Sequence, residues 1–130
     1  MIIGVDFGMK NIGLAYATDT LAVAWQTVPA KEFVSFLRSL ITEKLITEIV
    51  FGYPLKNENQ STKTSSRVDQ LIEMLSVEFP SIKSVKIDES MTTQIAVQIL
   101  RNNGYSPQSI EEKKDSESAR IILQSYLDEI

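Results

Sequence analysis

The first thirty residues alternate between apolar runs and short polar breaks, which is the pattern of β-strands joined by tight turns. Three apolar runs, at residues 1–7, 12–18 and 22–28, predict three strands. Because the breaks between these runs are only a few residues long, we expect the strands to pair as an antiparallel meander.

Helical and strand patterns alternate through the middle of the chain. Apolar side chains recur at helical spacing over residues 33–41 and again over residues 68–79. A short apolar segment follows each predicted helix, at residues 47–54 and 84–88, and has the length of a buried strand. Since helical crossovers join parallel strands, we expect these two strands to be parallel to their neighbours.

Polar residues and helix-ending residues define the remaining segments. Residues 56–66, KNENQSTKTSS, predict a loop or a frayed helix start. A third helix is expected to begin near the hydroxyl residues at 90–93, which offer N-caps, and to end at Gly104. Residues 105–114 predict a polar linker, and the apolar spacing of residues 119–130 predicts an amphipathic final helix.

The order of these elements, βββαβαβαα, predicts an α/β fold. We expect a five-stranded mixed sheet, in which three antiparallel strands are followed by parallel ones, with helices on both faces. A chain of 130 residues suffices for one sizeable core, so residues 1–130 are expected to form a single domain. Ligand sites in such sheets lie at the carboxyl ends of strands, where the sequence places Asp6, Pro54 and Glu89.

Asp6 is a carboxylate inside an otherwise apolar strand. The two-residue alternation places it on the same face as Ile2 and Gly4. An ionised carboxylate in a buried strand is costly unless it is hydrogen-bonded, paired or bound to a cation. Two interpretations carry similar weight for Asp6 alone: it accepts N–H groups from the turn that follows, or it binds a metal ion.

Other acidic residues stand at the same edge of the predicted sheet. Asp88 and Glu89 precede a helix, where the helix dipole favours acids, and Asp115 fits the N-cap of the last helix. For each of these residues taken alone, stabilisation of a helix N-terminus is a more common function than metal binding. A cluster of Asp6, Glu89 and Asp115, however, suits a pair of divalent ions about 3.5–4 Å apart that hydrolyses a phosphodiester. The small Gly52 on the intervening strand would let the side chains converge.

The composition restricts the chemistry to oxygen ligands. The chain has no cysteine and no histidine, which excludes disulfides, thiolate chemistry and imidazole chemistry. Carboxylates suit Mg²⁺ or Mn²⁺ rather than zinc. The net charge of −4 disfavours tight electrostatic binding of nucleic acid, although a nuclease with an acidic site neutralised by cations is compatible with it.

Basic residues flank the expected acidic site. They are Lys10 in the turn GMKNIG, Lys56 and Arg67 in and after the polar loop, and Lys114 directly before Asp115. Lysine and arginine at these positions would meet a phosphate backbone. Solvated turns and loops carry the same residues at least as often, so both readings stay open.

Four segments resemble one known family in their order and spacing. They are GVDFGMKNIGLAYA, FGYPLKN, DESMTT and KKDSESARIILQSYLD. Together they resemble the YqgF-type family, whose members carry the name "putative pre-16S rRNA nuclease" and are also described as Holliday-junction-resolvase-like. The resemblance covers nearly the whole chain and implies an RNase H-like fold.

The resemblance also implies roles for particular residues. Asp6, Glu89 and Asp115 match the family's acidic site, where they would be catalytic and hold one or two Mg²⁺ or Mn²⁺ ions. The basic residues Lys10, Lys56 and Arg67 match positions that face the nucleic-acid backbone.

The sequence departs from the family pattern at three places. Asn11 and Ser90 stand where the family usually has arginine, and the loop after Pro54-Leu55 lacks the usual glycine. The missing arginines affect substrate affinity and the identity of the substrate. Because the three carboxylates are intact, the catalytic reading stands.

Several functions remain open from the sequence. The leading one is a metal-dependent endonuclease that matures the 5′ end of pre-16S rRNA in ribosome biogenesis. Its partners would be precursor rRNA and ribosomal particles. The alternatives are a Holliday-junction resolvase acting on branched DNA and, in another class, a non-catalytic nucleic-acid-binding module. A phosphotransferase of the actin and sugar-kinase type would need a second such lobe.

The sequence also carries expectations about location and assembly. It contains no signal-peptide pattern and no apolar run of about 20 residues that would cross a bilayer. We therefore expect a cytoplasmic protein without membrane association, present as a monomer or weak dimer.

Overall fold

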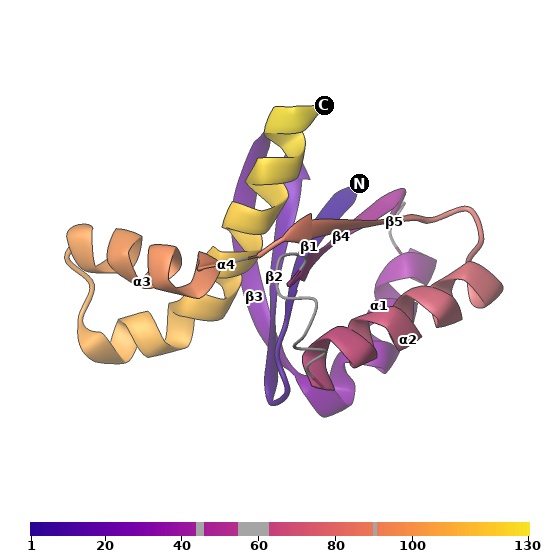
Figure 1. Ribbon diagram of the computed structural model, residues 1–130, viewed down its shortest axis with the longest axis horizontal. Coiled ribbons are helices and arrows are strands. Elements are labelled where there is room, and N and C mark those ends of the chain that lie inside the picture. The colour runs from indigo at the N-terminus through magenta and orange to yellow at the C-terminus, as the bar shows by residue number, and fades with distance from the viewer. Residues whose placement is uncertain (44–45, 55–62, 90) are drawn as a thin grey trace.

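Five strands form one mixed sheet through the middle of the molecule (Figure 1). The computed structural model describes residues 1–43, 46–54, 63–89 and 91–130. Its strands are β1 (Ile2–Phe7), β2 (Asn11–Thr18), β3 (Leu21–Pro29), β4 (Glu48–Tyr53) and β5 (Lys83–Asp88), in the spatial order β3-β2-β1-β4-β5. Strands β1 to β3 are antiparallel, whereas β4 runs parallel to β1 and β5 parallel to β4. The expected mixed sheet is confirmed.

Helices cover both faces of this sheet, as expected. Within the described ranges they are α1 (Phe33–Glu43), α2 (Lys63–Glu78), α3 (Thr92–Asn102) and α4 (Pro107–Glu129), with a 3₁₀ turn at Ala30–Glu32 before α1. Helices α1 and α2 lie on one face, and the second half of α4 crosses the other (Figure 1). Helix α3 lies beside the first half of α4, away from the sheet.

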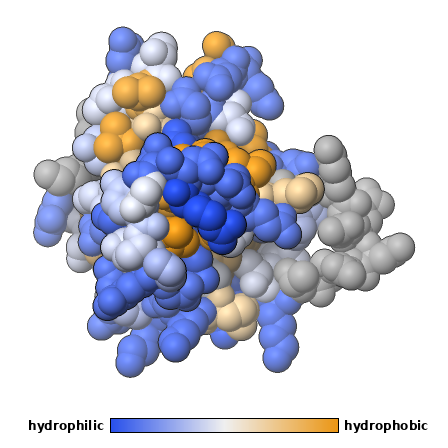
Figure 2. Space-filling model, turned by 90° about the vertical axis from the view of Figure 1, so that its left-hand side faces the viewer, coloured by the Kyte–Doolittle hydropathy of each residue, from blue (hydrophilic) through white to orange (hydrophobic). Residues whose placement is uncertain are grey.

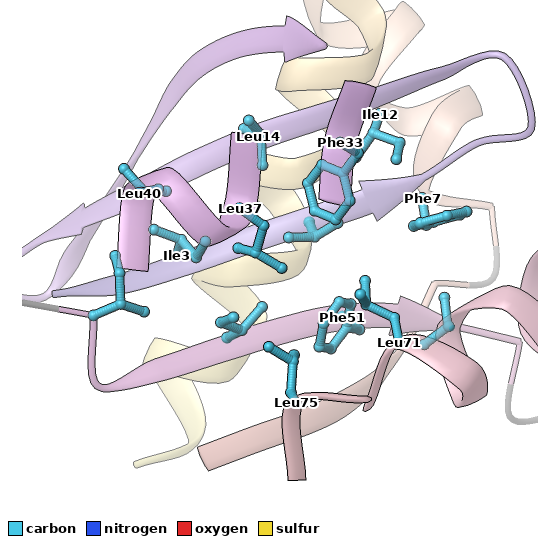
Figure 3. Packing of buried hydrophobic residues seen from close by; sticks show 14 of the residues in the cluster. Ile3, Phe7, Ile12, Leu14, Phe33, Leu37, Leu40, Phe51, Leu71 and Leu75 are labelled. Carbon is cyan, nitrogen blue, oxygen red and sulfur yellow. The ribbon is translucent and has the colours of Figure 1, made fainter. Parts of the chain in front are cut away.

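The two faces of the sheet carry separate apolar cores. Figure 3 shows the core under α1 and α2, where Phe7 of β1 meets Phe33 of α1 edge to face, with ring centroids 5.9 Å apart. The core under α4 is built from smaller strand residues and the apolar stripe of that helix; its members are Ala15, Ala22, Val50, Ala119, Ile122, Leu123, Tyr126 and Leu127. The alternation of β1 sends Ile3, Val5 and Phe7 to the first core and leaves Asp6 on the α4 face.

Helix α3 begins differently from the expectation. Its N-cap is Met91, whose side chain accepts no hydrogen bond from the first turn. The expected cap by a hydroxyl residue is wrong for the described residues 91–93, because Met91 has a left-handed backbone (φ 63°) whereas a capping serine or threonine has an extended one. Ser90 lies outside the described residues.

The other end of α3 confirms the expected stop at Gly104. This glycine has a φ of 85°, a left-handed conformation that is unfavourable for other residues. The N–H of Tyr105 donates to the carbonyl of Leu100 at 3.2 Å, and the N–H of Gly104 donates to the carbonyl of Arg101 at 3.0 Å. This pair of bonds is the Schellman arrangement that ends a helix.

The expected linker at residues 105–114 is wrong from position 107 onward, because α4 already begins at Pro107. Ser106 is the N-cap, and its hydroxyl accepts a hydrogen bond from the Ser109 N–H at 3.2 Å. Proline is favoured at the first helical position because it lacks the N–H that would stay unbonded there. This part of α4 lies beside α3 (Figure 1), and Ile110 is its one buried residue before position 115, so it carries little of the apolar periodicity that marks residues 119–130.

The end of the molecule formed by α3 and the first half of α4 is largely hydrophilic, with apolar residues visible between polar ones (Figure 2). Exposed apolar side chains here include Met91, Ile95 and Tyr105. In the part of the chain that the structure describes, no helix has the length and apolar character needed to span a membrane.

Replacing Ser118 by alanine is expected to stabilise the protein. Ser118 is fully buried in α4, and its hydroxyl has no hydrogen-bond partner among the described residues. An unsatisfied buried polar group costs about 1–3 kcal/mol, so Ser118→Ala should raise the free energy of unfolding by about 1 kcal/mol in urea denaturation. Ser125→Ala is the matched control: that serine is exposed on α4 and donates to the Ile121 carbonyl, so a change within about 0.5 kcal/mol is expected. A loss of stability in Ser118→Ala would contradict the assignment.

Candidate functional site

An open pocket of about 590 Å³ lies at the carboxyl ends of β1, β4 and β5. Its lining includes the three acidic residues singled out from the sequence, Asp6, Glu89 and Asp115. They come from the end of β1, from the residue after β5, and from the middle of α4. Sheet topology therefore gathers side chains that are far apart in the sequence, at the edge where ligand sites are expected.

Asp6 is the most strongly perturbed of the three carboxyls. Its pKa is raised from the usual 3.8 to about 7, mainly by burial and in addition by the nearby negative charges of Glu89 and Asp115. The side chain of Asp6 also shares a hydrogen bond with Glu89, in which Asp6 holds the proton. An interpretation in which Asp6 only accepts N–H groups from the turn after β1 does not account for this hydrogen bond with Glu89.

Glu89 reaches Asp6 across the strand that lies between them. Strand β4 separates β1 from β5, and Gly52 occupies the crossing point. A Cβ atom on residue 52 would lie 2.7 Å from Glu89 Oε2 and 3.2 Å from Glu89 Cβ, so the Glu89 side chain occupies the space above this glycine. The expected convergence over Gly52 is thus what the structure contains. Burial is the main cause of the raised pKa of Glu89, and Asp88 adds to it.

Asp115 is positioned by the contact of α4 with β2. A Cβ atom on Gly13 would lie 1.9 Å from the carbonyl oxygen of Asp115 and 2.8 Å from the nitrogen of Ser116. The helix backbone therefore rests directly on the strand, and Gly13 is the register partner of Asp6. The N-cap interpretation of Asp115 is wrong, because α4 starts at Pro107 and Asp115 lies well inside it. Burial raises its pKa, while Lys114 lowers it.

The pocket is acidic without a compensating positive side chain. Its lining within the described chain contains no lysine or arginine. No three acidic side chains of the described residues are close enough to chelate one ion as they stand. Mg²⁺ is commonly held by one or two carboxylates together with waters and substrate phosphates, so the touching pair Asp6 and Glu89, with Asp115 facing the same pocket, fits such an ion.

Three of the basic residues expected to meet nucleic acid, Lys10, Arg67 and Lys114, are absent from the described lining of this pocket. Lys10 is exposed at the β1–β2 turn, beside Lys31. Arg67 on α2 lines a separate hollow with Phe7 and Phe33. Lys114, which directly precedes Asp115 on α4, pairs with Glu111 at 3.1 Å. Lys56 lies outside the described residues.

The sequence interpretation missed part of the pocket lining. Thr92, Thr93 and Gln94, in the first turn of α3, all face the same space as the acidic residues, as does Thr64 at the start of α2. Their signal was present as two adjacent threonines after the acidic pair 88–89, but it was interpreted as helix capping alone. Gly13 was also visible as a glycine inside a strand, which often marks a close approach by another backbone.

The mixed sheet, its crossover order and the acidic pocket at the strand ends together define an RNase H-like α/β protein. The sequence matches the RuvX family, described as Holliday junction resolvase, over residues 1–129. The chain belongs to this family, and the resemblance based on its four motifs is confirmed.

Relatives from several bacteria carry the name "Putative pre-16S rRNA nuclease". One from Mesoplasma florum is 38% identical, with 99% of this chain and 96% of that protein covered. One from Dictyoglomus turgidum is 34% identical, with 99% and 94% covered. One from Chlorobium phaeobacteroides is 30% identical, with 98% and 91% covered. A crystal structure titled as a putative sugar kinase from Cytophaga hutchinsonii aligns with a TM-score of 0.45 at 17% identity, over 74% of this chain and 38% of that one.

Gly13→Ala is expected to displace α4 at Asp115. The added methyl group would meet helix backbone at 1.9 Å, which no side-chain rotation can relieve. Overpacking of this kind costs about 1–3 kcal/mol in the free energy of unfolding, measurable by urea denaturation. Gly104→Ala provides the comparison: it has open space around it and only the strain of a positive φ, so the acidic pocket should stay intact. A Gly13→Ala variant as stable as wild type, with unchanged chemical shifts at Asp115, would contradict the described contact.

Asp6→Asn is expected to remove a pH dependence of folding stability in metal-free protein. Because the folded pKa of Asp6 is about 7 and the unfolded pKa is near 3.8, the folded state binds the proton more tightly. Stability should therefore fall as the pH rises from about 4 to about 7, by at most about 4 kcal/mol. Urea denaturation in EDTA at several pH values measures this slope. Asp128→Asn, an exposed change at the far end of α4, should keep the wild-type slope. Parallel curves for Asp6→Asn and wild type would refute the assignment.

Proposed function

We propose that this chain is a divalent-metal-dependent endonuclease that hydrolyses phosphodiester bonds. The observation that carries the proposal is the gathering of Asp6, Glu89 and Asp115 in one pocket at the carboxyl ends of the strands. Three carboxylates that share a pocket without a lysine or arginine repel one another, and a divalent cation relieves this repulsion. The cation would be Mg²⁺ or Mn²⁺, since all available ligands are oxygen atoms.

The roles of the residues follow from their positions. Asp6 and Glu89, which already touch, would hold the cation in place of the proton they share, and Asp115 would complete its surroundings from α4. The chemistry that the bound cation supplies is Lewis-acid activation of the attacking water and stabilisation of the departing oxygen. In the reaction the water oxygen bonds to phosphorus and the bond to the leaving oxygen breaks. The proton lost by water balances the one gained by the leaving oxygen.

The substrate we propose is precursor 16S rRNA, cleaved in the maturation of its 5′ end during ribosome biogenesis. Support comes from the name shared by relatives that are 30–38% identical over nearly the full chain. The description of the family favours a second candidate, resolution of branched DNA at a Holliday junction. Both activities would use the same acidic site.

A non-catalytic nucleic-acid-binding module is the candidate from another class. The residues Asn11 and Ser90, in place of the family's usual arginines, favour it. The intact carboxylates argue against it, because a pure binding surface for an anionic polymer gains nothing from three partly buried acids.

Basic residues outside the pocket would bind flanking phosphates and not the one being cleaved. Lys10 in the β1–β2 turn and Lys31 in the 3₁₀ turn before α1 are exposed and line one hollow, while Arg67 lies on α2 and Lys114 on α4. Lys56 is proposed to act with them on the basis of its match to the family. Spread over several elements, these residues would orient a long substrate over the acidic pocket.

The test is cleavage of a precursor 16S rRNA fragment and of a four-way DNA junction with Mg²⁺ or Mn²⁺. Wild type should cleave the RNA only when the metal is present, and Asp6→Asn should lower the rate by at least about a hundredfold because a cation ligand is lost. Asp128→Asn, the same substitution far from the pocket, should retain the wild-type rate.

Two outcomes of this assay would overturn parts of the proposal. Cleavage by purified Asp6→Asn at the wild-type rate would show that the acidic site does not catalyse the reaction. Cleavage of the junction without cleavage of the RNA would replace the substrate by branched DNA.

A further inference from the structure

A hollow between α1 and α2 has the size and lining of a site for one aromatic ring. Its volume is about 190 Å³, and its lining includes Phe7, Phe33 and Leu71. These three side chains lie toward the same end of the core under the two helices (Figure 3). An apolar cavity of about 150 Å³ accommodates benzene, whereas sites for larger organic ligands span about 300–1,000 Å³. The hollow therefore suits a single ring system.

The apolar lining of the hollow is partly open to water. Phe33 is fully buried and Leu71 is 5% exposed, but Val34 is 36% exposed and Met74 is half-buried. A ring placed against these side chains would cover apolar surface that water now reaches, and this burial is favourable. The hollow can therefore gain a ligand without unfolding the core beneath it.

Helix α2 adds polar groups to this apolar hollow. Arg67 and Gln70 line it together with Leu71 and Met74, at helical spacings that place all four on one face of α2. A guanidinium binds phosphate oxygens in a bidentate manner and also stacks on flat rings. The amide of a glutamine both donates and accepts hydrogen bonds, as the edge of a nucleobase does. A ligand that uses all of these groups is a flat heterocycle with an attached phosphate, which describes a nucleotide.

The hollow lies between the acidic pocket and a basic hollow. Phe7 lines both the acidic pocket and this hollow. Ala30 lines both this hollow and the one that contains Lys10 and Lys31. The three sites are therefore adjacent, in the order acidic, apolar, basic. A nucleic-acid strand presents phosphates and bases in alternation, so a strand with one phosphate at the acidic pocket can place a base in the apolar hollow and a further phosphate at the lysines.

We infer that the hollow between α1 and α2 binds one unpaired nucleobase of the substrate, beside the phosphodiester that is cleaved. This inference rests on the proposed function, because it defines more closely the substrate of the acidic site. A base inside a duplex is stacked and paired, so it enters the hollow only from a single-stranded segment or after leaving the stack. The substrate class is therefore nucleic acid that is unpaired at the site of cleavage. Arg67 holds a phosphate of the nucleotide whose base is bound.

The experiment is a titration of protein carrying ¹³C-labelled methyl groups, followed by chemical shifts, with uridine 5′-monophosphate and with ribose 5-phosphate. The two ligands share the sugar and the phosphate and differ in the base. The nucleotide should shift the methyl signals of Val34, Leu71 and Met74, because its ring would lie against them. Ribose 5-phosphate should bind at least about tenfold more weakly and leave these signals in place.

Two pairs of variants identify the hollow as the site. Val34→Trp fills the hollow and should weaken nucleotide binding at least about tenfold, whereas Val77→Trp should bind as wild type does, because Val77 is 73% exposed on α2 and does not line the hollow. Arg67→Ala should weaken binding at least about tenfold through loss of a hydrogen bond to the charged phosphate. Arg101→Ala, at an exposed arginine at the end of α3, should leave the affinity unchanged. The same spectra report whether each variant is folded, and the arginine pair leaves the apolar core intact.

Three results would overturn the inference. They are equal shifts of these methyl signals by both ligands, no shift by the nucleotide, and nucleotide binding by folded Val34→Trp or by Arg67→Ala as tight as that of wild type. Shifts of the same signals on dilution of the free protein would show that a second copy of this chain occupies the hollow, and would also overturn the inference.

The outcome is distinguishable from the outcome of the nuclease assay. If the nucleotide shifts the three methyl signals but no nucleic acid is cleaved, the base-binding hollow stands and the proposed function fails. If RNA is cleaved but Val34→Trp leaves both nucleotide affinity and KM unchanged, the nuclease stands and the base-binding hollow fails.

Discussion

The contact between α4 and β2 at Gly13 is the constraint on which the candidate site depends. A side chain at position 13 would occupy the space of the Asp115 carbonyl, so glycine lets the helix backbone rest on the strand. Gly13 is the register partner of Asp6, and the contact therefore brings Asp115 to the carboxylate of β1. Gly52 has the matching function for Glu89 on the other side of β1. Two missing side chains thus create the space in which three acidic side chains share a pocket.

The burial that results is costly for the metal-free protein. Asp6 keeps its proton up to about pH 7 and shares it with Glu89, whereas an exposed aspartate would be ionised. The fold tolerates this because both faces of the sheet are otherwise filled by apolar side chains, the larger ones under α1 and α2. Acidic side chains gathered in this way destabilise the fold. Their presence is explained if they bind a cation that acts on a phosphodiester.

Much of the fold followed from the sequence, because the burial of each strand is recorded in its own residues. The alternation in β1 identified the face of Asp6, and the short apolar runs of β4 and β5 identified the parallel strands. The first half of α4 did not follow, since residues 107–114 have little apolar spacing, although Ser106 and Pro107 marked its start. The acidic residues were found from their place at strand ends, whereas the function of Gly13 required knowledge of which backbone lies above it.

The most direct test of this account is calorimetric titration of metal-free protein with Mn²⁺. Wild type should bind the ion, Asp115→Asn should weaken its affinity by about 10- to 100-fold, and Asp128→Asn on the same helix should leave it unchanged. This result would show that the approach of α4 to Gly13 creates a cation site together with Asp6 and Glu89. Absence of Mn²⁺ binding by wild type, or equal affinity in all three proteins, would contradict the account.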